Sequence, residues 1–225
     1  MGFWSIKDLI AHIAWYENQM VDLDSGKPPP DDVWWELSLD DRNALEQTLA
    51  DRPKGSPARD HYVYYPDVSA VPEFSGPQLP GRSFSIAAGV VLDSADAEGV
   101  LYAQGGVAGG HTLYLQDRRL VYAYNWLDIQ HTTVVSDREL EPGPHVLTAE
   151  FTAEGRSEPP MPGAQGTLRL YIDDDEVGSS PLVTQPGYFN PVGDGHVVGR
   201  KDGSPVTPAY TPPFRFTGGT LDRVV

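Results

Sequence analysis

Two periodicities of hydrophobic and polar positions divide the chain near residue 52. In residues 1–52, apolar side chains recur every three or four positions, which predicts two short amphipathic helices. The first follows a capping box at Ser5 and Asp8 and ends before Pro28, and the second begins at Ser38 and ends before Pro53. Two helices of this size cannot enclose a core, so we expect a helical N-terminal extension that docks on another structure or belongs to a larger helical bundle.

In residues 53–225, hydrophobic and polar residues alternate in short stretches, and clusters of Gly, Pro and Asp separate these stretches. This pattern predicts strands joined by turns. Tight hairpins are predicted at Gln116–Arg119 and Asp173–Asp175, and the glycines of 105–110 predict a β-connection. The predicted strands are His61–Tyr65, Ser83–Leu92, Gly99–Ala103, His111–Gln116, Leu120–Trp126, Thr132–Ser136, His145–Thr152, Gly166–Asp173, Glu176–Ser179, His196–Gly199 and Phe214–Val225. With no helical crossovers between them, we predict a mostly β domain, an antiparallel β-sandwich of the jelly-roll, concanavalin- or lectin-like type. Because the last predicted strand runs to Val225, we expect this domain to be truncated at its C-terminus.

Composition and charge narrow the class of protein. The 225 residues include 23 glycines and 21 prolines, which suits a turn-rich β protein. The formal net charge of −16 argues against nucleic-acid and anionic-membrane partners, because both require a basic surface. The sequence has no cysteine, so disulfides, thiolate zinc sites and thiol nucleophiles are excluded. The N-terminus has no basic region followed by an apolar run, so we expect a cytoplasmic protein.

No motif of enzyme chemistry is complete in this sequence. The six histidines are at least five residues apart, so none forms a local metal-binding pair, although a site assembled across strands stays open. The acidic run 173–176 lacks the alternating ligands of a calcium loop and suits a solvated turn. Neither a Gly-x-Ser-x-Gly elbow nor a glycosidase carboxylate run occurs. We therefore predict no catalytic residue, no metal site and no cofactor in this chain.

An aromatic group is the remaining candidate for binding. Tyr122, Tyr124 and Trp126 lie at i, i+2 and i+4 of one predicted strand and so share one face. Tyr114 lies on the preceding strand, and His131 lies in the loop that follows. Planar rings of this kind stack on the apolar faces of sugars, which makes these residues the candidate ligand-binding group, although core packing explains the same stripe more simply.

The segments from residue 51 onward resemble the C-terminal β-region of bacterial arylsulfatases. The matching blocks are Asp51–Pro57, Arg59–Pro66, Glu98–Gly106, Gly110–Leu115, Leu120–Trp126, Val198–Arg200, Ser204–Pro208 and Phe214–Thr220. In that family the chemistry belongs to a preceding α/β region, with a formylglycine made from a Cys/Ser-x-Pro-x-Arg motif and a divalent cation, calcium. Here Ser157-Glu158-Pro159-Pro160-Met161 has Met in place of the required Arg, so the nucleophile is missing. The family's acidic metal-ligand motifs are absent too, so the cation site is also missing.

Residues 3–46 are instead similar to the opening of DinB-like four-helix-bundle proteins. The similarity lies in Trp4–Glu17, and His12 matches the first of three histidine ligands in the metal-binding members. The other ligands and helices of such a bundle are missing, so we expect no metal at His12. Alternatively, Trp34–Glu36 and Leu39–Arg42 resemble the segment that leads into the arylsulfatase β-region. We expect domains at 1–52 and 53–225, in a chain that is a fusion of two pieces or a fragment.

The resemblance and the residues together give two hypotheses about function. The first is a non-catalytic C-terminal β-sandwich module of an arylsulfatase-like protein, whose partner would be a sulfatase catalytic region. The alternative is a stand-alone lectin-like module that binds a carbohydrate or a protein partner through the aromatic group.

Overall fold

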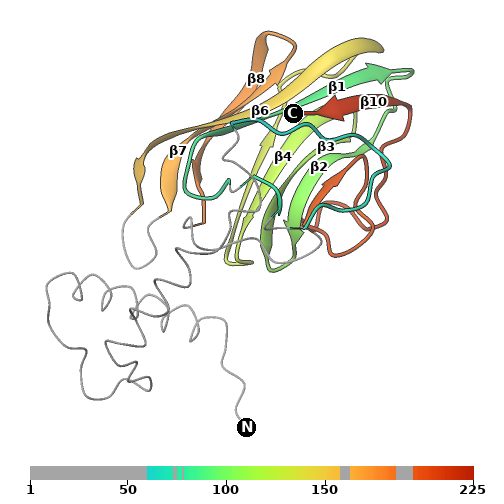
Figure 1. The fold of residues 1–225 in the computed structure, drawn as a ribbon. Coiled ribbons are helices and arrows are strands. Elements are labelled where there is room, and N and C mark those ends of the chain that lie inside the picture. The colour runs from blue at the N-terminus through green and yellow to red at the C-terminus, as the bar shows by residue number, and fades with distance from the viewer. Residues whose placement is uncertain (1–59, 73–74, 78, 158–162, 186–194) are drawn as a thin grey trace, which may run out of the picture. The chain divides into compact units, whose positions relative to one another are not determined.

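The computed structural model describes residues 60–72, 75–77, 79–157, 163–185 and 195–225, in which ten strands form two five-stranded antiparallel sheets (Figure 1). The first sheet has the order β10 (Gly219–Val224), β1 (Phe84–Leu92), β6 (Gly143–Arg156), β7 (Ala164–Ile172) and β8 (Asp175–Val183). The second has the order β5 (Gln130–Val135), β4 (Arg119–Trp126), β3 (Gly109–Gln116), β2 (Gly99–Gly106) and β9 (His196–Val198). We call these the β1 sheet and the β3 sheet.

The predicted antiparallel β-sandwich is confirmed, and most predicted strands lie within two to four residues of the observed ones. Both predicted hairpins are present, with positive φ at Asp117, Arg118 and Asp173. Two strand predictions were wrong in extent. The segment His61–Tyr65 makes only an isolated bridge from Tyr64 to Val224, and the last strand begins at Gly219 rather than Phe214. The two predicted N-terminal helices lie outside the described residues.

The main core lies between the two sheets. Inward-facing side chains of β1, β6 and β7 pack against those of β3 and β4, and the largest of them are fully buried. Among them are Leu113, Leu115, Tyr122, Phe151, Leu168 and Leu170. This alternation follows from strand geometry, since every second residue points to the same face.

A second apolar cluster covers the outer face of the β3 sheet. Val206, Tyr210 and Phe214, from the segment that precedes β10, pack over Tyr114 of β3 and Val121 of β4. For this reason β2, β3 and β4 are buried on both faces, whereas strands of the β1 sheet alternate between buried and exposed positions.

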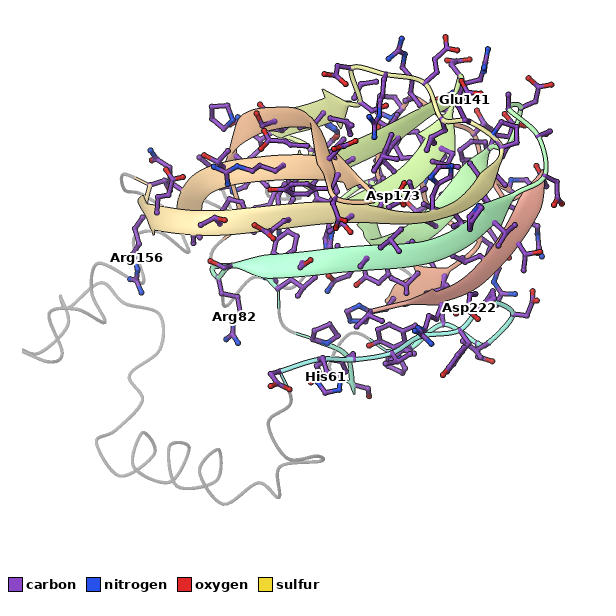
Figure 2. The ribbon with its side chains drawn as sticks, turned by 90° about the horizontal axis from the view of Figure 1, so that it is seen from above. His61, Arg82, Glu141, Arg156, Asp173 and Asp222 are labelled. Atoms are coloured by element: carbon purple, nitrogen blue, oxygen red, sulfur yellow. The ribbon has the colours of Figure 1, made fainter. Side chains whose placement is uncertain are left out.

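The strand ends define two ends of the sandwich. The β2–β3 and β4–β5 turns lie together at the lower end of the β3 sheet in Figure 1, close to the start of β1 and the end of β8. Figure 2 looks onto the β1 sheet and shows Arg82 and Arg156 near this end, with Glu141 and Asp173 toward the other. Among the described residues, no helix has the length and hydropathy that a membrane crossing requires.

Candidate functional site

Tyr122 and Tyr124 share one face of β4, as predicted, but that face is the core. Their exposed fractions are 0% and 3%, and both belong to the cluster between the sheets. A sugar needs solvent access to the face of a ring, so the structure corrects the expectation that these two tyrosines form an open platform. They follow the alternative of core packing.

Burial also sets the chemistry of these two hydroxyls. Desolvation raises the pKa of Tyr124, whose hydroxyl accepts a 2.8 Å hydrogen bond from the Gln185 backbone N–H. Desolvation, with smaller contributions from Tyr124 and Tyr102, raises the pKa of Tyr122 well above its usual value. Both tyrosines are therefore neutral structural groups at physiological pH.

Tyr114 points to the opposite side of the β3 sheet and is separate from the other aromatic residues. Its ring packs against Tyr210 at 5.3 Å and Phe214 at 6.3 Å between ring centres. Desolvation, together with Tyr210 and Asp117, raises the pKa of Tyr114 to about 12. The structure thus corrects the grouping of Tyr114 with Tyr122, Tyr124 and Trp126.

Trp126 and His131 both lie near the surface at the two ends of the β4–β5 turn, but on opposite faces of the β3 sheet: Trp126 shares the core-facing side with Tyr122 and Tyr124, whereas His131 is paired with Asn125 on the outer side. Trp126 is half-buried at the end of β4, where its ring closes the core and its Nε1–H donates to the Thr184 carbonyl oxygen at 3.2 Å. His131 begins the exposed part of β5, and its Nε2 lies 3.2 Å from Asp128 Oδ1. Both flank the β4–β5 turn.

Asn125 joins this turn to the β2–β3 turn. Its buried side-chain amide donates to the carbonyl oxygens of Gly106 and Val107, at 3.2 and 2.9 Å. Its Oδ1 accepts a 2.7 Å hydrogen bond from the Asp128 N–H. Leu127 and Asp128 both have positive φ, a strained conformation that this bond helps to hold. We call the two turns (106–109 and 126–130) and the strand end Thr184–Gln185 the rim.

Gln185 is an unusual residue at the rim because its amide is buried without partners. Among the described residues, neither its Nε2 nor its Oε1 has a hydrogen-bond partner, and the residue is 0% exposed. The amide lies next to Gly109 of the β2–β3 turn: if Gly109 carried a Cβ atom, that atom would be 3.2 Å from Gln185 Oε1 and 3.4 Å from Leu127 Cδ2. The amide therefore lies against the β2–β3 turn, close to the side chain of Leu127 in the β4–β5 turn.

Behind the rim, a histidine-rich group continues into the core. His111 Nε2 lies 2.8 Å from Gln104 Oε1, and its ring contacts those of Phe84, Tyr102, Tyr122 and Tyr124. Desolvation, assisted by the nearby His196, lowers the pKa of His111 to about 3. His196 Nδ1 in turn lies 2.7 Å from the Tyr102 hydroxyl. In the described ranges, no group of three or more His, Asp or Glu side chains is arranged to hold a metal ion.

The charge at this end of the sandwich is mixed. Arg82 and Arg156 are exposed near it (Figure 2), and so are Asp128 and Glu154. Sequence analysis missed Asn125, Asp128 and Gln185. The Asn-Trp-Leu-Asp sequence at 125–128 is typical of a turn and could have indicated Asn125 and Asp128. No residue near Gln185 in the sequence indicates that Gln185 lies at the rim.

Comparison with known proteins gives similarity of fold only. No family model and no curated protein matches the sequence. Solved structures similar to this chain include the mouse laminin α1 chain, domains LG4-5, at a TM-score of 0.48 and 15% identity, over 73% of this chain and 38% of that one. The Ruminococcus gnavus IT-sialidase CBM40 bound to α2,3-sialyllactose has a TM-score of 0.44 and 10% identity, over 64% of this chain and 74% of that one. The heptameric SAP-like pentraxin of Limulus polyphemus has a TM-score of 0.41 and 11% identity, over 72% of this chain and 74% of that one.

At these values the likeness carries no argument about function. None of the three is an arylsulfatase or a DinB-like protein, so both of those resemblances stay predictions.

Proposed function

We propose that this chain is a non-catalytic, lectin-like β-sandwich module that binds a glycan at the rim. The observation that carries the proposal is the position of Trp126. Its ring is half-buried at the end of β4 and is held by the hydrogen bond to Thr184, directly before the β4–β5 turn that carries the exposed Asp128. Sugar sites combine an apolar ring face with a few fixed hydrogen-bonding groups.

The rim supplies both kinds of contact. The indole offers a surface for the C–H face of a pyranose, and Ile129 and Val107, each about half-exposed, extend the apolar area on the two turns. Asp128 and His131 supply an acceptor and a ring nitrogen for sugar hydroxyls, and their mutual contact orients them. Because Asn125 ties the two turns together, these groups are held in place before a ligand arrives.

The test is a glycan array probed with the purified full chain and with matched variants. Trp126→Ala should abolish retention of the glycans that the wild type binds, and His131→Ala should weaken it at an exposed position that carries little packing. Tyr65→Ala is the control, because Tyr65 is also aromatic, is 54% exposed, and lies on the segment that pairs with β10.

Trp126→Ala will also lower stability, because the ring packs on the core. Binding is therefore measured well below the melting temperature of each variant, and Trp126→Phe, which keeps an aromatic face, should retain part of the binding. A chain that retains no glycan, or a Trp126→Ala variant that binds like the wild type, overturns the proposal.

A further inference from the structure

The buried amide of Gln185 is not explained by the fold. Leaving a buried donor and acceptor without partners costs stability, so native proteins rarely keep such a group unless it has a use. Its backbone N–H is satisfied by the Tyr124 hydroxyl, which fixes the residue at the end of β8. Among the described residues, only the side-chain amide is left without a hydrogen bond at this position.

The amide also lies at the place where the proposed glycan would be bound. The preceding residue, Thr184, receives the Trp126 indole hydrogen bond, and both Gly109 and Leu127 of the two rim turns lie beside the amide. The unpartnered amide and the half-buried indole are thus neighbours at the rim, contributed by the end of β8 and the end of β4 beside the β2–β3 turn.

We propose that Gln185 is the specificity residue of this site and that it binds two adjacent hydroxyls of a neutral pyranose. The inference rests on the proposed function. A primary amide offers an acceptor oxygen beside a donor nitrogen. In a vicinal diol, one hydroxyl donates to Oε1 while the next accepts from Nε2, so both unmet positions are filled at once.

Access to the amide requires a small local movement. Its two polar atoms are shielded, and Leu127, a half-buried side chain on a surface turn, lies close to them. None of the three hydrogen bonds of Asn125 involves the Leu127 side chain, so this side chain can rotate away from the amide while those bonds stay in place. Leu127→Ala should therefore bind the same glycosides at least as tightly as the wild type.

The experiment measures binding of simple glycosides by the full chain and by Gln185→Met, which has similar volume and no amide. The probes are methyl β-D-glucopyranoside, methyl β-D-galactopyranoside and methyl α-D-mannopyranoside, each with its monodeoxy derivatives. We expect Gln185→Met to bind the preferred glycoside about tenfold more weakly or worse, the loss of roughly one or two hydrogen bonds. Its melting temperature should be unchanged or higher, because an unpaired buried polar group has been removed.

The monodeoxy glycosides show whether Gln185 recognises particular hydroxyls or whether the substitution weakens binding in general. Removing either hydroxyl of the recognised pair should weaken binding to the wild type about tenfold and leave binding to Gln185→Met unchanged. Gln116→Met, at the opposite end of the β3 sheet, is the control and should bind like the wild type.

The two proposals fail in different ways. If Trp126→Ala loses binding while Gln185→Met keeps the wild-type affinity and the same response to deoxygenation, the role of Gln185 is overturned and the glycan site stands. If none of the glycosides or arrayed glycans binds the wild type, both proposals fall. A drop in the melting temperature of Gln185→Met would show that the amide has a structural partner and would also overturn its assignment.

Discussion

The side-chain amide of Asn125 donates a 2.9 Å hydrogen bond to the carbonyl oxygen of Val107, which links the β4–β5 turn to the β2–β3 turn from within the sandwich. The same amide reaches Gly106, and its oxygen accepts from Asp128. One buried side chain therefore sets the geometry of both rim turns.

Asn125→Ala tests this link. It removes three hydrogen bonds from a buried position, so the free energy of unfolding should fall by about 2–4 kcal/mol. Denaturant titration measures the change, and the glycan binding proposed for the rim should weaken because the Asp128 N–H loses its acceptor. Gln116→Ala is the control: it removes one exposed 3.2 Å bond to Ala209 and should change the free energy by less than about 1 kcal/mol. Equal effects from the two variants would contradict the linking role.

Removing the hydroxyl from each of the two core tyrosines of β4 should change the free energy of unfolding in different ways. Among the described residues, the Tyr122 hydroxyl has no hydrogen-bond partner, so Tyr122→Phe should leave the free energy of unfolding unchanged or raise it by up to about 1 kcal/mol. Tyr124→Phe deprives the Gln185 N–H of its acceptor and should lower it by about 1–3 kcal/mol. A loss on Tyr122→Phe as large as on Tyr124→Phe would indicate a buried water at Tyr122.

Buried His111 should make stability depend on pH. Its pKa is lowered from 6.5 to about 3, chiefly by desolvation, so between these values the unfolded chain binds a proton that the folded chain excludes. Its contribution to stability is complete above pH 6.5 and is lost as the pH falls toward 3, at about 1.4 kcal/mol per pH unit. His111→Gln keeps a polar group beside Gln104 but cannot titrate. Its free energy of unfolding, measured by urea titration from pH 7 to 4, should fall less steeply than that of the wild type, and parallel curves would refute the effect.

Because of Asp173, we expect the free energy of unfolding to fall a second time, at a more acidic pH. Desolvation acts to raise its pKa, but hydrogen bonds from the Val146 N–H and from His145, at 2.9 and 3.0 Å, outweigh it and the pKa is lowered. The unfolded chain therefore takes up the proton first, and this stability is present above about pH 4 and lost below it.

Asp173→Asn isolates that charge. Asn tolerates the positive φ of this turn and can still accept the Val146 hydrogen bond, so the substitution removes mainly the charge interactions with His145 and Arg138. Because the pair is partly exposed, we expect a loss of about 0.2–1 kcal/mol at pH 6 and a smaller loss at pH 3. The same loss at both pH values would point to backbone geometry instead of charge.

The sequence by itself determined the local features of this protein. Alternation places Tyr122 and Tyr124 on one face of a strand whatever the strand packs against, because successive side chains point to opposite faces. The hairpins at Asp117–Arg118 and Asp173 could be predicted for the same reason, since the preference of Asp for tight turns is a property of a few neighbouring residues.

Only the tertiary structure decided which faces are buried and which residues meet. Tyr114 and Tyr122 have similar sequence surroundings, yet one lies under Tyr210 and Phe214 and the other lies between the sheets. Gln185 reaches Tyr124 across 61 residues of chain, and Trp126 reaches the surface because β4 ends there. Burial depends on contacts between segments far apart in the chain, and the periodicity within one strand carries no information about them.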